Sequence, residues 1–213
     1  MRKVIIAVLL SMLLFGSIYF IELNICKLSY RKNKYEAEEI LRIAHNLVDN
    51  QSRKNENVSI NNDSSTSNVL NNNKETKMNK SENDIIGILY IEKLDIEAPV
   101  KEGTTQEVMK TSIGHFPESD YWNGNVSLAS HNSGTSMHYF QDIHTLNIND
   151  QIKYKTQFGE KVYKVQSIDK INDTDWSKVV KNDSYEKQKN TITLITCING
   201  QPDYRLCVRG VEV

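Results

Sequence analysis

The sequence predicts a mainly β domain over residues 84–213, preceded by one membrane-spanning helix. Residues 4–21 are 18 consecutive uncharged and mostly apolar positions. Residues 50–83 contain 11 asparagines and only four Val, Ile or Leu residues. Beyond residue 84, short runs rich in β-branched and aromatic residues alternate with turn residues, which is typical of strands. These observations divide the chain into an anchor, a linker and a globular head.

The N-terminal apolar run is close to the length of about 20 residues that a helix needs to cross a bilayer. A cleaved signal peptide has a similar composition, but no small-x-small cleavage pattern follows the run. We therefore interpret residues 1–26 as an uncleaved transmembrane signal anchor. Basic residues precede the run at positions 2 and 3 and follow it between positions 27 and 34, so the positive-inside rule alone leaves the orientation open.

Two segments are predicted between the anchor and the head. Residues 27–49 are expected to continue as an amphipathic stalk helix, because apolar residues recur at helical spacing from Ile40 to Leu47. Residues 50–83 bury too little apolar surface to offset chain entropy, so we predict a disordered Asn/Ser/Lys-rich linker. Such a linker would let the head work at some distance from the bilayer.

Charge and cysteine content exclude several classes of protein. Residues 84–213 contain 14 basic and 18 acidic residues, so the head is mildly acidic and no nucleic-acid partner is expected. The three cysteines, Cys26, Cys197 and Cys207, are too few for a disulfide framework. Because the sequence has neither a CxxC pair nor an HExxH motif, zinc is not expected, and we predict no metal ligands and no cofactor. Calcium dependence stays open, since the acidic residues Glu92, Asp95, Glu97 and Glu102 could be calcium ligands or solvated surface.

The head is predicted to consist of short strands and two short helices. The predicted strands are residues 85–91, 96–100, 125–129, 151–156, 161–171, 191–197 and 204–213. The predicted helices are residues 104–112 and 175–180. Seven or eight short strands with minor helices indicate a small barrel or a sandwich.

The strongest chemical signal is Cys197, which ends an apolar strand and precedes a turn-rich loop. If this loop closes a hairpin, Cys197 pairs with Tyr204 or Arg205, and the Arg205 guanidinium can stand beside the thiol. Side-chain alternation puts Ile195 and Cys207 next to the thiol, where they would floor a groove. A lone cysteine in an apolar strand is nevertheless more often a buried small hydrophobic residue than a nucleophile.

A cysteine nucleophile needs a group that exchanges protons with it. Histidine is the usual choice because its pKa lies near neutrality. Among the five histidines, His131 follows the predicted strand 125–129 directly, at a strand end where loops usually present catalytic groups. Taken alone, a single histidine is more often a surface or structural residue.

These residues closely resemble the motifs of the sortase family. The matching segments are Asn125-Val126-Ser127-Leu128-Ala129-Ser130-His131, Thr193-Leu194-Ile195-Thr196-Cys197 and Arg205-Leu206-Cys207-Val208. The family pattern is an apolar strand ending in Gly-His, the motif TLxTC, and an arginine near the start of the next strand; this chain departs from it at Ser130, where glycine is common. The resemblance covers residues 84–213 and implies a closed eight-stranded sortase-type β-barrel with short helices as the catalytic domain.

The resemblance also implies an activity, partners and a location. Cys197 would attack an LPxTG-like sorting signal and form a thioacyl intermediate, His131 would exchange protons, and Arg205 would stabilise the oxyanion or hold the substrate, with Ile195 and Cys207 in the substrate groove. The partners would be surface proteins bearing a sorting signal and an amine acceptor such as a peptidoglycan precursor or a pilin lysine. The enzyme would be a single-pass protein of a Gram-positive cell membrane, with a cytoplasmic N-terminus and an extracellular catalytic domain. Class A/D-like and class B-like sortases both fit.

Two other functions stay open at the level of sequence. A membrane-tethered cysteine hydrolase would release its acyl product to water rather than to an amine. A non-catalytic extracytoplasmic β module would merely bind the cell wall. The behaviour of Cys197 toward a substrate, with and without an amine, discriminates among the three.

Overall fold

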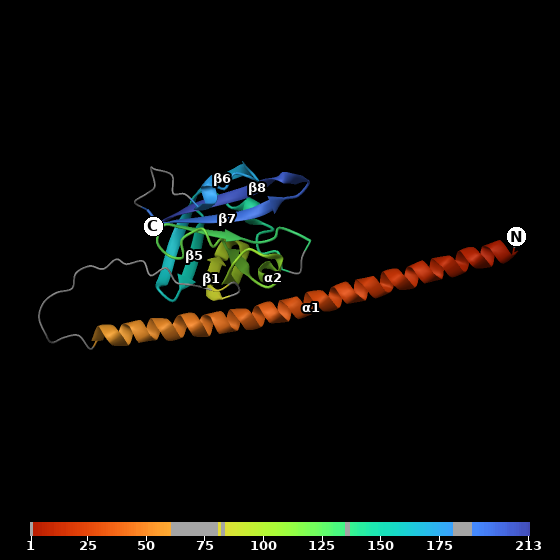
Figure 1. Cartoon of the computed structure of the whole chain (residues 1–213), viewed down its shortest axis with the longest axis horizontal. Coiled ribbons are helices and arrows are strands. Elements are labelled where there is room, and N and C mark those ends of the chain that lie inside the picture. Colours follow the sequence, from red (N-terminus) through yellow and green to blue (C-terminus); the bar gives the residue numbers. More distant parts are fainter. Residues whose placement is uncertain (1, 61–80, 82–83, 135–136, 181–188) are drawn as a thin grey trace, which may run out of the picture.

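The computed structural model describes residues 2–60, 81, 84–134, 137–180 and 189–213. A long helix, α1 (Arg2–Ile60), runs beside a closed barrel of eight strands (Figure 1). The barrel strands are β1 (Ile85–Ile91), β2 (Ile96–Glu102), β3 (Ile113–His115), β4 (Asn125–Ala129), β5 (Gln151–Thr156), β6 (Gly159–Asn172), β7 (Thr191–Ile198) and β8 (Gln201–Glu212). The short helices are η1 (Glu92–Leu94), α2 (Gln106–Met109), η2 (Ile143–Thr145) and α3 (Ser177–Val180). The predicted eight-stranded barrel with short helices is confirmed.

The strand order around the barrel is β1-β2-β3-β4-β7-β8-β6-β5. Neighbouring strands are antiparallel except for β2 with β3 and β4 with β7, which are parallel. The parallel pairing of β4 with β7 joins segments that are far apart in the sequence. Because parallel strands end at the same edge, the carboxyl ends of β4 and β7 lie side by side.

Alternation along the strands separates the barrel interior from its outer face. Leu128 and Leu194 point into the main core, whereas their neighbours Ala129 and Ile195 belong to a second, smaller apolar cluster. This outer cluster consists of Phe116, Ala129, Ile171, Val179, Ile195 and Cys207. Since Val179 belongs to α3, this short helix covers part of the outer face of the barrel.

The predicted elements agree with those of the structure, apart from differences at some ends and one short strand that was not predicted. Three of the predicted strands, 85–91, 125–129 and 151–156, have the bounds of β1, β4 and β5. β3 was not predicted, because a strand of three residues is too short to show an alternating pattern. The predicted helix 104–112 is confined to α2, whose first turn is capped by the Thr105 side chain.

The predicted anchor and stalk form one continuous helix. Residues 2–26 and 27–49 both belong to α1, and Met12–Asn50 contains a window apolar enough to cross a membrane. Residues 50–60, predicted as the start of the linker, extend α1; this stretch contains neither Gly nor Pro, the two residues that disfavour a helix most strongly. The rest of the predicted linker lies outside the described residues, apart from Ser81.

The second half of α1 packs along the barrel at β1 and β2 (Figure 1). Four small or apolar residues at a spacing of three and four are buried there: Ala37, Ile40, Ala44 and Val48. Ala44 is 0% exposed, whereas the adjacent Ile43 on the outward face is 40% exposed. Of the apolar residues predicted to form the stalk's stripe, Ile40 and Ala44 face the barrel, whereas Ile43 and Leu47 are exposed.

Candidate active site

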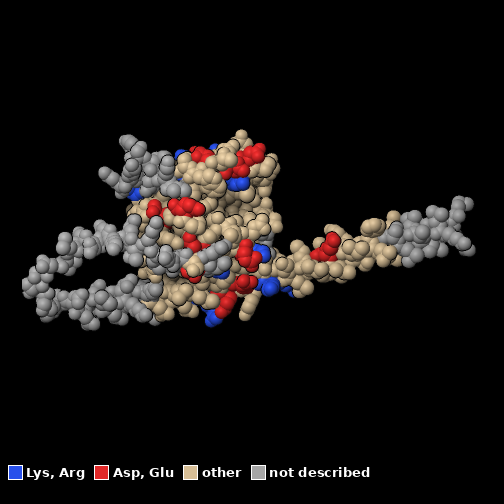
Figure 2. All heavy atoms as spheres, viewed as in Figure 1, with Lys and Arg blue, Asp and Glu red and all other residues tan. Residues whose placement is uncertain are grey.

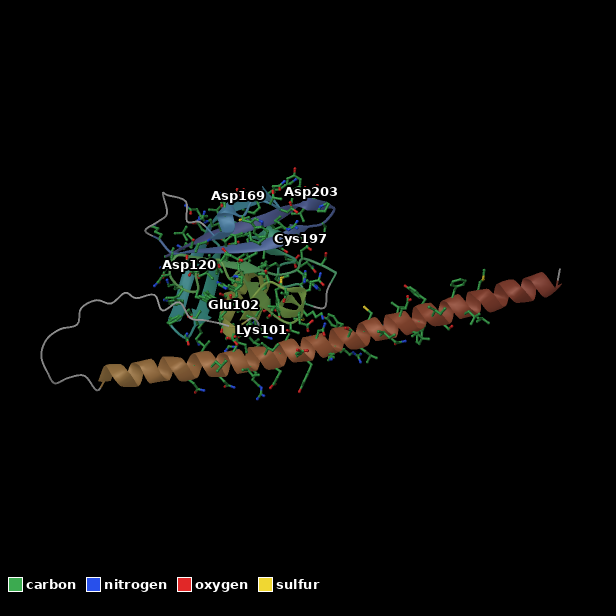
Figure 3. The ribbon with its side chains drawn as sticks, in the orientation of Figure 1. Lys101, Glu102, Asp120, Asp169, Cys197 and Asp203 are labelled. Atoms are coloured by element: carbon green, nitrogen blue, oxygen red, sulfur yellow. The ribbon has the colours of Figure 1, made fainter. Side chains whose placement is uncertain are left out.

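The carboxyl ends of β4 and β7 bring a histidine and a cysteine to one edge of the barrel. β4 ends two residues before His131, and Cys197 is the penultimate residue of β7. Ala129 pairs with Ile195, so the two strands reach this edge in register. Cys197 lies at the end of the barrel that is nearer to the N-terminus of α1 (Figure 3).

Hydrogen bonds join the segment around His131 to the segment around Cys197. The Asn132 side-chain amide donates to the Cys197 carbonyl at 2.6 Å. The Thr196 hydroxyl donates to the Ser130 carbonyl at 2.8 Å. Each such bond contributes about 1 kcal/mol net, and together they hold the residues before and after His131 against the end of β7.

Serine before the histidine fits the backbone at this point. Among the described non-glycine residues, positive φ angles occur at Asp95 and Asn149 and not at Ser130. Ser130 therefore has a backbone conformation that residues with a side chain adopt without strain.

Cys197 pairs directly with Arg205 across the β7–β8 hairpin, which confirms one of the two predicted pairings. The Arg205 guanidinium is held by its own loop: Nη1 donates to the Pro202 carbonyl at 2.6 Å and to the Tyr204 carbonyl at 2.8 Å. Nη2 lies 3.7 Å from the Asp173 carboxylate. These contacts fix a permanent positive charge on the strand next to the thiol.

His131, Cys197 and Arg205 all line one open groove of about 200 Å³. The other lining residues are Thr104, Met109, Phe116, Ala129, Ser130, Ile171, Asn172, Asp173, Asp175, Trp176, Val179, Ile195 and Thr196. Most of the exposed surface of the groove is apolar, and His131, Cys197 and Arg205 are among the polar residues that line it. An apolar trough with a few convergent polar groups is typical of a site that binds and processes an extended ligand.

The imidazole of His131 is uncharged near neutral pH. It is half-buried, and burial lowers its pKa below the ordinary histidine value. A neutral imidazole can accept a proton from a thiol and return it later in a reaction. The groove therefore contains a base, an exposed thiol and a fixed cation.

The structure separates the two predicted groove residues. Ile195 lines the groove, whereas Cys207 is 0% exposed and is not part of its surface. Cys207 pairs with Ile195 and is covered by Ile171 and Val179, because β6 and α3 shield this part of β8. Cys207 thus supports the groove from beneath without reaching it. Both hairpin cysteines are free thiols.

The two cysteines of the hairpin are expected to differ sharply in reactivity. Cys197 is exposed, whereas burial raises the pKa of Cys207 to about 11, with a smaller contribution from Asp169. Since the thiolate is the reactive form, iodoacetamide should alkylate Cys197 in the folded protein well before Cys207. Mass spectrometry of the two cysteine-bearing peptides measures both rates. Similar rates under native conditions would contradict this arrangement, and full unfolding should remove the difference.

Two aromatic residues that the sequence did not assign to the site form part of the groove wall. Trp176 is 53% exposed and meets Phe116 edge to face, with ring centroids 5.7 Å apart. Phe116 follows the short strand β3, so its position could not be inferred without that strand. An exposed indole at a groove wall offers a surface for an apolar or aliphatic ligand.

Asn125 holds the helix next to this wall. Its fully buried side chain donates to the Val179 carbonyl at 2.7 Å and the Lys178 carbonyl at 3.1 Å. The Thr191 and Thr193 hydroxyls donate to its side-chain oxygen. Asn125 thereby ties α3 to β4 and β7 by hydrogen bonds that satisfy the helix carbonyls. A polar residue at the start of a strand gave no sequence signal for this role.

The charges on one face of the molecule and the grouping of potential metal ligands bear on what else the protein could bind. On the face shown in Figure 2, basic side chains are scattered among acidic ones. Within the described ranges, no group of three or more His, Cys, Asp or Glu residues is placed to hold a metal ion.

Comparison with known proteins identifies relatives of the barrel. A protein-family model described as "Sortase domain" matches residues 89–213. The chain is 29% identical over 113 residues to "Sortase D" of Bacillus subtilis (strain 168), covering 52% of this chain and 53% of that protein. It thus spans about half the length of this curated relative.

Solved structures show the same similarity. Sortase C1 from Streptococcus agalactiae is 29% identical, with a TM-score of 0.54 over 61% of this chain and 67% of that one. The Clostridium perfringens Sortase D5 transpeptidase is 22% identical, with a TM-score of 0.57 over 87% of this chain and 98% of that one. At this lower identity the likeness concerns the fold alone.

Proposed function

The chain belongs to the sortase family, and from this premise we propose that it is a membrane-anchored cysteine transpeptidase acting on an LPxTG-like sorting signal. The observation that carries the proposal is the meeting of His131, Cys197 and Arg205 in one groove. The acceptor would be an amine of a peptidoglycan precursor or a pilin lysine. Neither a cofactor nor a metal takes part in the proposed reaction.

In the first half of the reaction, Cys197 loses its thiol proton to His131 and attacks the carbonyl carbon between Thr and Gly of the signal. A carbon–sulfur bond forms while the Thr–Gly amide bond breaks. His131 gives the proton to the leaving amine. The Arg205 guanidinium donates hydrogen bonds to the oxyanion that develops on the attacked carbonyl. A thioester on Cys197 remains.

In the second half, an incoming amine loses a proton to His131 and attacks the thioester carbonyl. A new amide bond forms, and the sulfur of Cys197 departs and regains its proton from the imidazole. The apolar wall of the groove, which includes Met109, Phe116 and Ile195, favours a peptide over water at the carbonyl. This preference separates a transpeptidase from a hydrolase.

The proposed topology follows from the same premise. Residues 1–26 would span the membrane with the N-terminus in the cytoplasm, and residues 84–213 would form the extracellular catalytic domain. The apolar stretch within Met12–Asn50 supports an anchor of this kind. The enzyme would then share the membrane surface with the precursors of its substrates.

The function is tested by incubating the protein with an LPxTG-like peptide, with and without an amine acceptor, and identifying products by mass spectrometry. An amine-dependent ligation product is expected. Cleavage that ignores the acceptor would favour the hydrolase. A wall-binding module would show neither product, and a thiol-reactive substrate analogue would then leave Cys197 unlabelled.

Replacing Arg205 by alanine should lower kcat/KM by about 10²-fold to 10³-fold, because an oxyanion donor acts chiefly in the transition state. Arg205→Lys should recover only part of the loss, since an ammonium lacks the planar donor pair. Lys170→Ala is the matched control, because Lys170 is an exposed cation on the neighbouring strand, 3.7 Å from the Tyr204 ring centre. Steady-state peptide kinetics measure all three variants, and equal losses in Arg205→Ala and Lys170→Ala would contradict the assignment.

A further inference from the structure

One hydrogen bond and one ion pair fix how α1 sits on the barrel. His45 Nε2 lies 2.7 Å from Glu97 Oε1 of β2, and Asp49 Oδ1 lies 2.8 Å from Lys155 Nζ of β5. Partly exposed pairs of this kind contribute at most about 1 kcal/mol each. Burial of the apolar stripe supplies most of the attraction, at about 1.5–3 kcal/mol for a residue such as Ile40. These two polar contacts therefore set the register of the docked helix.

The same two polar contacts define the direction of β2 relative to α1. His45 meets β2 at Glu97. Asp49, one turn further along α1, contacts Lys155 of β5. Lys155 and Pro99 of β2 both pair with Ile88 of the intervening strand β1, so they lie at the same level of the barrel. β2 therefore runs in the same direction as α1, away from the N-terminus of the helix.

Strand directions then determine which edge of the barrel faces the N-terminus of α1. β3 is parallel to β2, β4 is antiparallel to β3, and β7 is parallel to β4. β4 and β7 thus run back toward the N-terminus of α1. Their carboxyl ends carry His131 and Cys197, so the open groove lies on the side of the apolar segment. Figure 3 shows the same arrangement, with Cys197 on the side of the barrel nearer to the N-terminus.

The separation between the apolar segment and the barrel is short. Ile21 is the last residue of the apolar run, and Asn33 is the first half-buried residue of α1. The helix rises roughly 18 Å between them at 1.5 Å per residue. The headgroup layer of one leaflet occupies about 5–8 Å of that rise. The groove edge of the barrel would therefore stand only a little above the headgroups.

We propose that docked α1 acts as a rigid spacer that holds the catalytic groove facing the bilayer at a fixed height, so that the enzyme favours substrates that are themselves held in the membrane. The inference rests on the proposed function, because it takes residues 1–26 as the anchor. A fixed height differs from the long reach that the sequence predicted for a head tethered by residues 50–83. The barrel is already joined to α1 by the buried stripe from Ala37 to Val48. A substrate held in the same membrane gains effective concentration only if the groove meets it at the right height.

The test uses the full chain in lipid vesicles and two forms of one LPxTG-like peptide. One form is free in solution, and the other carries a C-terminal transmembrane helix in the same vesicles. Ala44→Glu puts a charged side chain into the docking stripe, whereas Ile43→Glu puts the same side chain on the outward face one residue away. Ala44→Glu should lower turnover of the membrane-held peptide by about tenfold or more and leave the free peptide unchanged. Ile43→Glu should change neither.

A second variant tests height without disturbing the docking stripe. A seven-residue helical insertion after Ser29 raises the barrel by about 10 Å and rotates it by only about 20°. It should reproduce the selective loss on the membrane-held peptide. The spacer would be overturned if both variants left turnover of the membrane-held peptide unchanged, or if they lowered turnover of both peptides equally. In either case, turnover of the free peptide by the unaltered protein would still support the transpeptidase. An unaltered protein that processes neither peptide would overturn both proposals.

Discussion

Replacing Cys197 by alanine is expected to abolish transfer of the sorting peptide, with a loss in kcat/KM of about 10⁴-fold or more. Alanine has no group that can form the thioester, and within the described groove no other thiol reaches the surface. Steady-state kinetics measure the loss, and mass spectrometry of the intact protein should show no acyl adduct. Circular dichroism and thermal unfolding should match the parent protein, because the replaced side chain is exposed.

Cys207→Ala is the matched control for this prediction. Cys207 lies on the facing strand of the same hairpin but is fully buried beneath the groove. Its replacement should leave activity per folded molecule nearly intact and lower the free energy of unfolding by about 1 kcal/mol, the usual cost of a small core truncation. If transfer survives in Cys197→Ala, or disappears in Cys207→Ala while the fold is intact, the assignment of Cys197 as the nucleophile is wrong.

Replacing His131 by alanine should reduce kcat/KM by about 10²-fold to 10⁴-fold, the usual contribution of a positioned acid and base. The thiol remains, but the described groove then has no imidazole to take its proton and return it to the leaving amine. His144→Ala is the control, because His144 is exposed on η2 and does not line the groove. Peptide kinetics at one pH compare the two variants. A loss no larger in His131→Ala than in His144→Ala would remove His131 from the mechanism.

The pH dependence of His131 follows from its burial. Burial lowers its pKa, so the imidazole stays neutral as the pH falls toward the free-histidine value of about 6.5. It takes up a proton only below that value, and the capacity to accept the thiol proton is lost there. NMR titration of His131 in the Cys197→Ala protein isolates this group from the thiol. A midpoint at or above the free-histidine value would contradict the assigned environment.

Local sequence patterns predicted the parts of the site that neighbouring residues determine. The apolar run into Cys197 and the turn-rich loop after it gave the hairpin and limited its register to two choices, one of which is the observed Cys197–Arg205 pair. The apolar strand before His131 gave β4 with correct bounds. The joint role of these residues came from their resemblance to a known family, because no local pattern links His131 to Cys197.

Long-range packing accounts for what the sequence did not reveal. Cys207 was expected in the groove, but coverage of β8 by α3 depends on the Asn125 side chain, which is distant in sequence. The docking of α1 was likewise hidden, because an amphipathic stripe does not say which surface it will meet. Both features depend on contacts between segments that sequence periodicity describes separately.

The parallel pairing of β4 with β7 also has a consequence for the order of events during folding. This pairing closes a long loop of the chain. Contacts between residues far apart in the sequence are expected to form late, because the chain loses the conformational entropy of loop closure before these contacts stabilise it. We expect the imidazole and the thiol to stay apart until β4 pairs with β7. An incompletely folded chain would carry an inert cysteine, and recovery of activity during refolding would report closure of the barrel rather than formation of its hairpins.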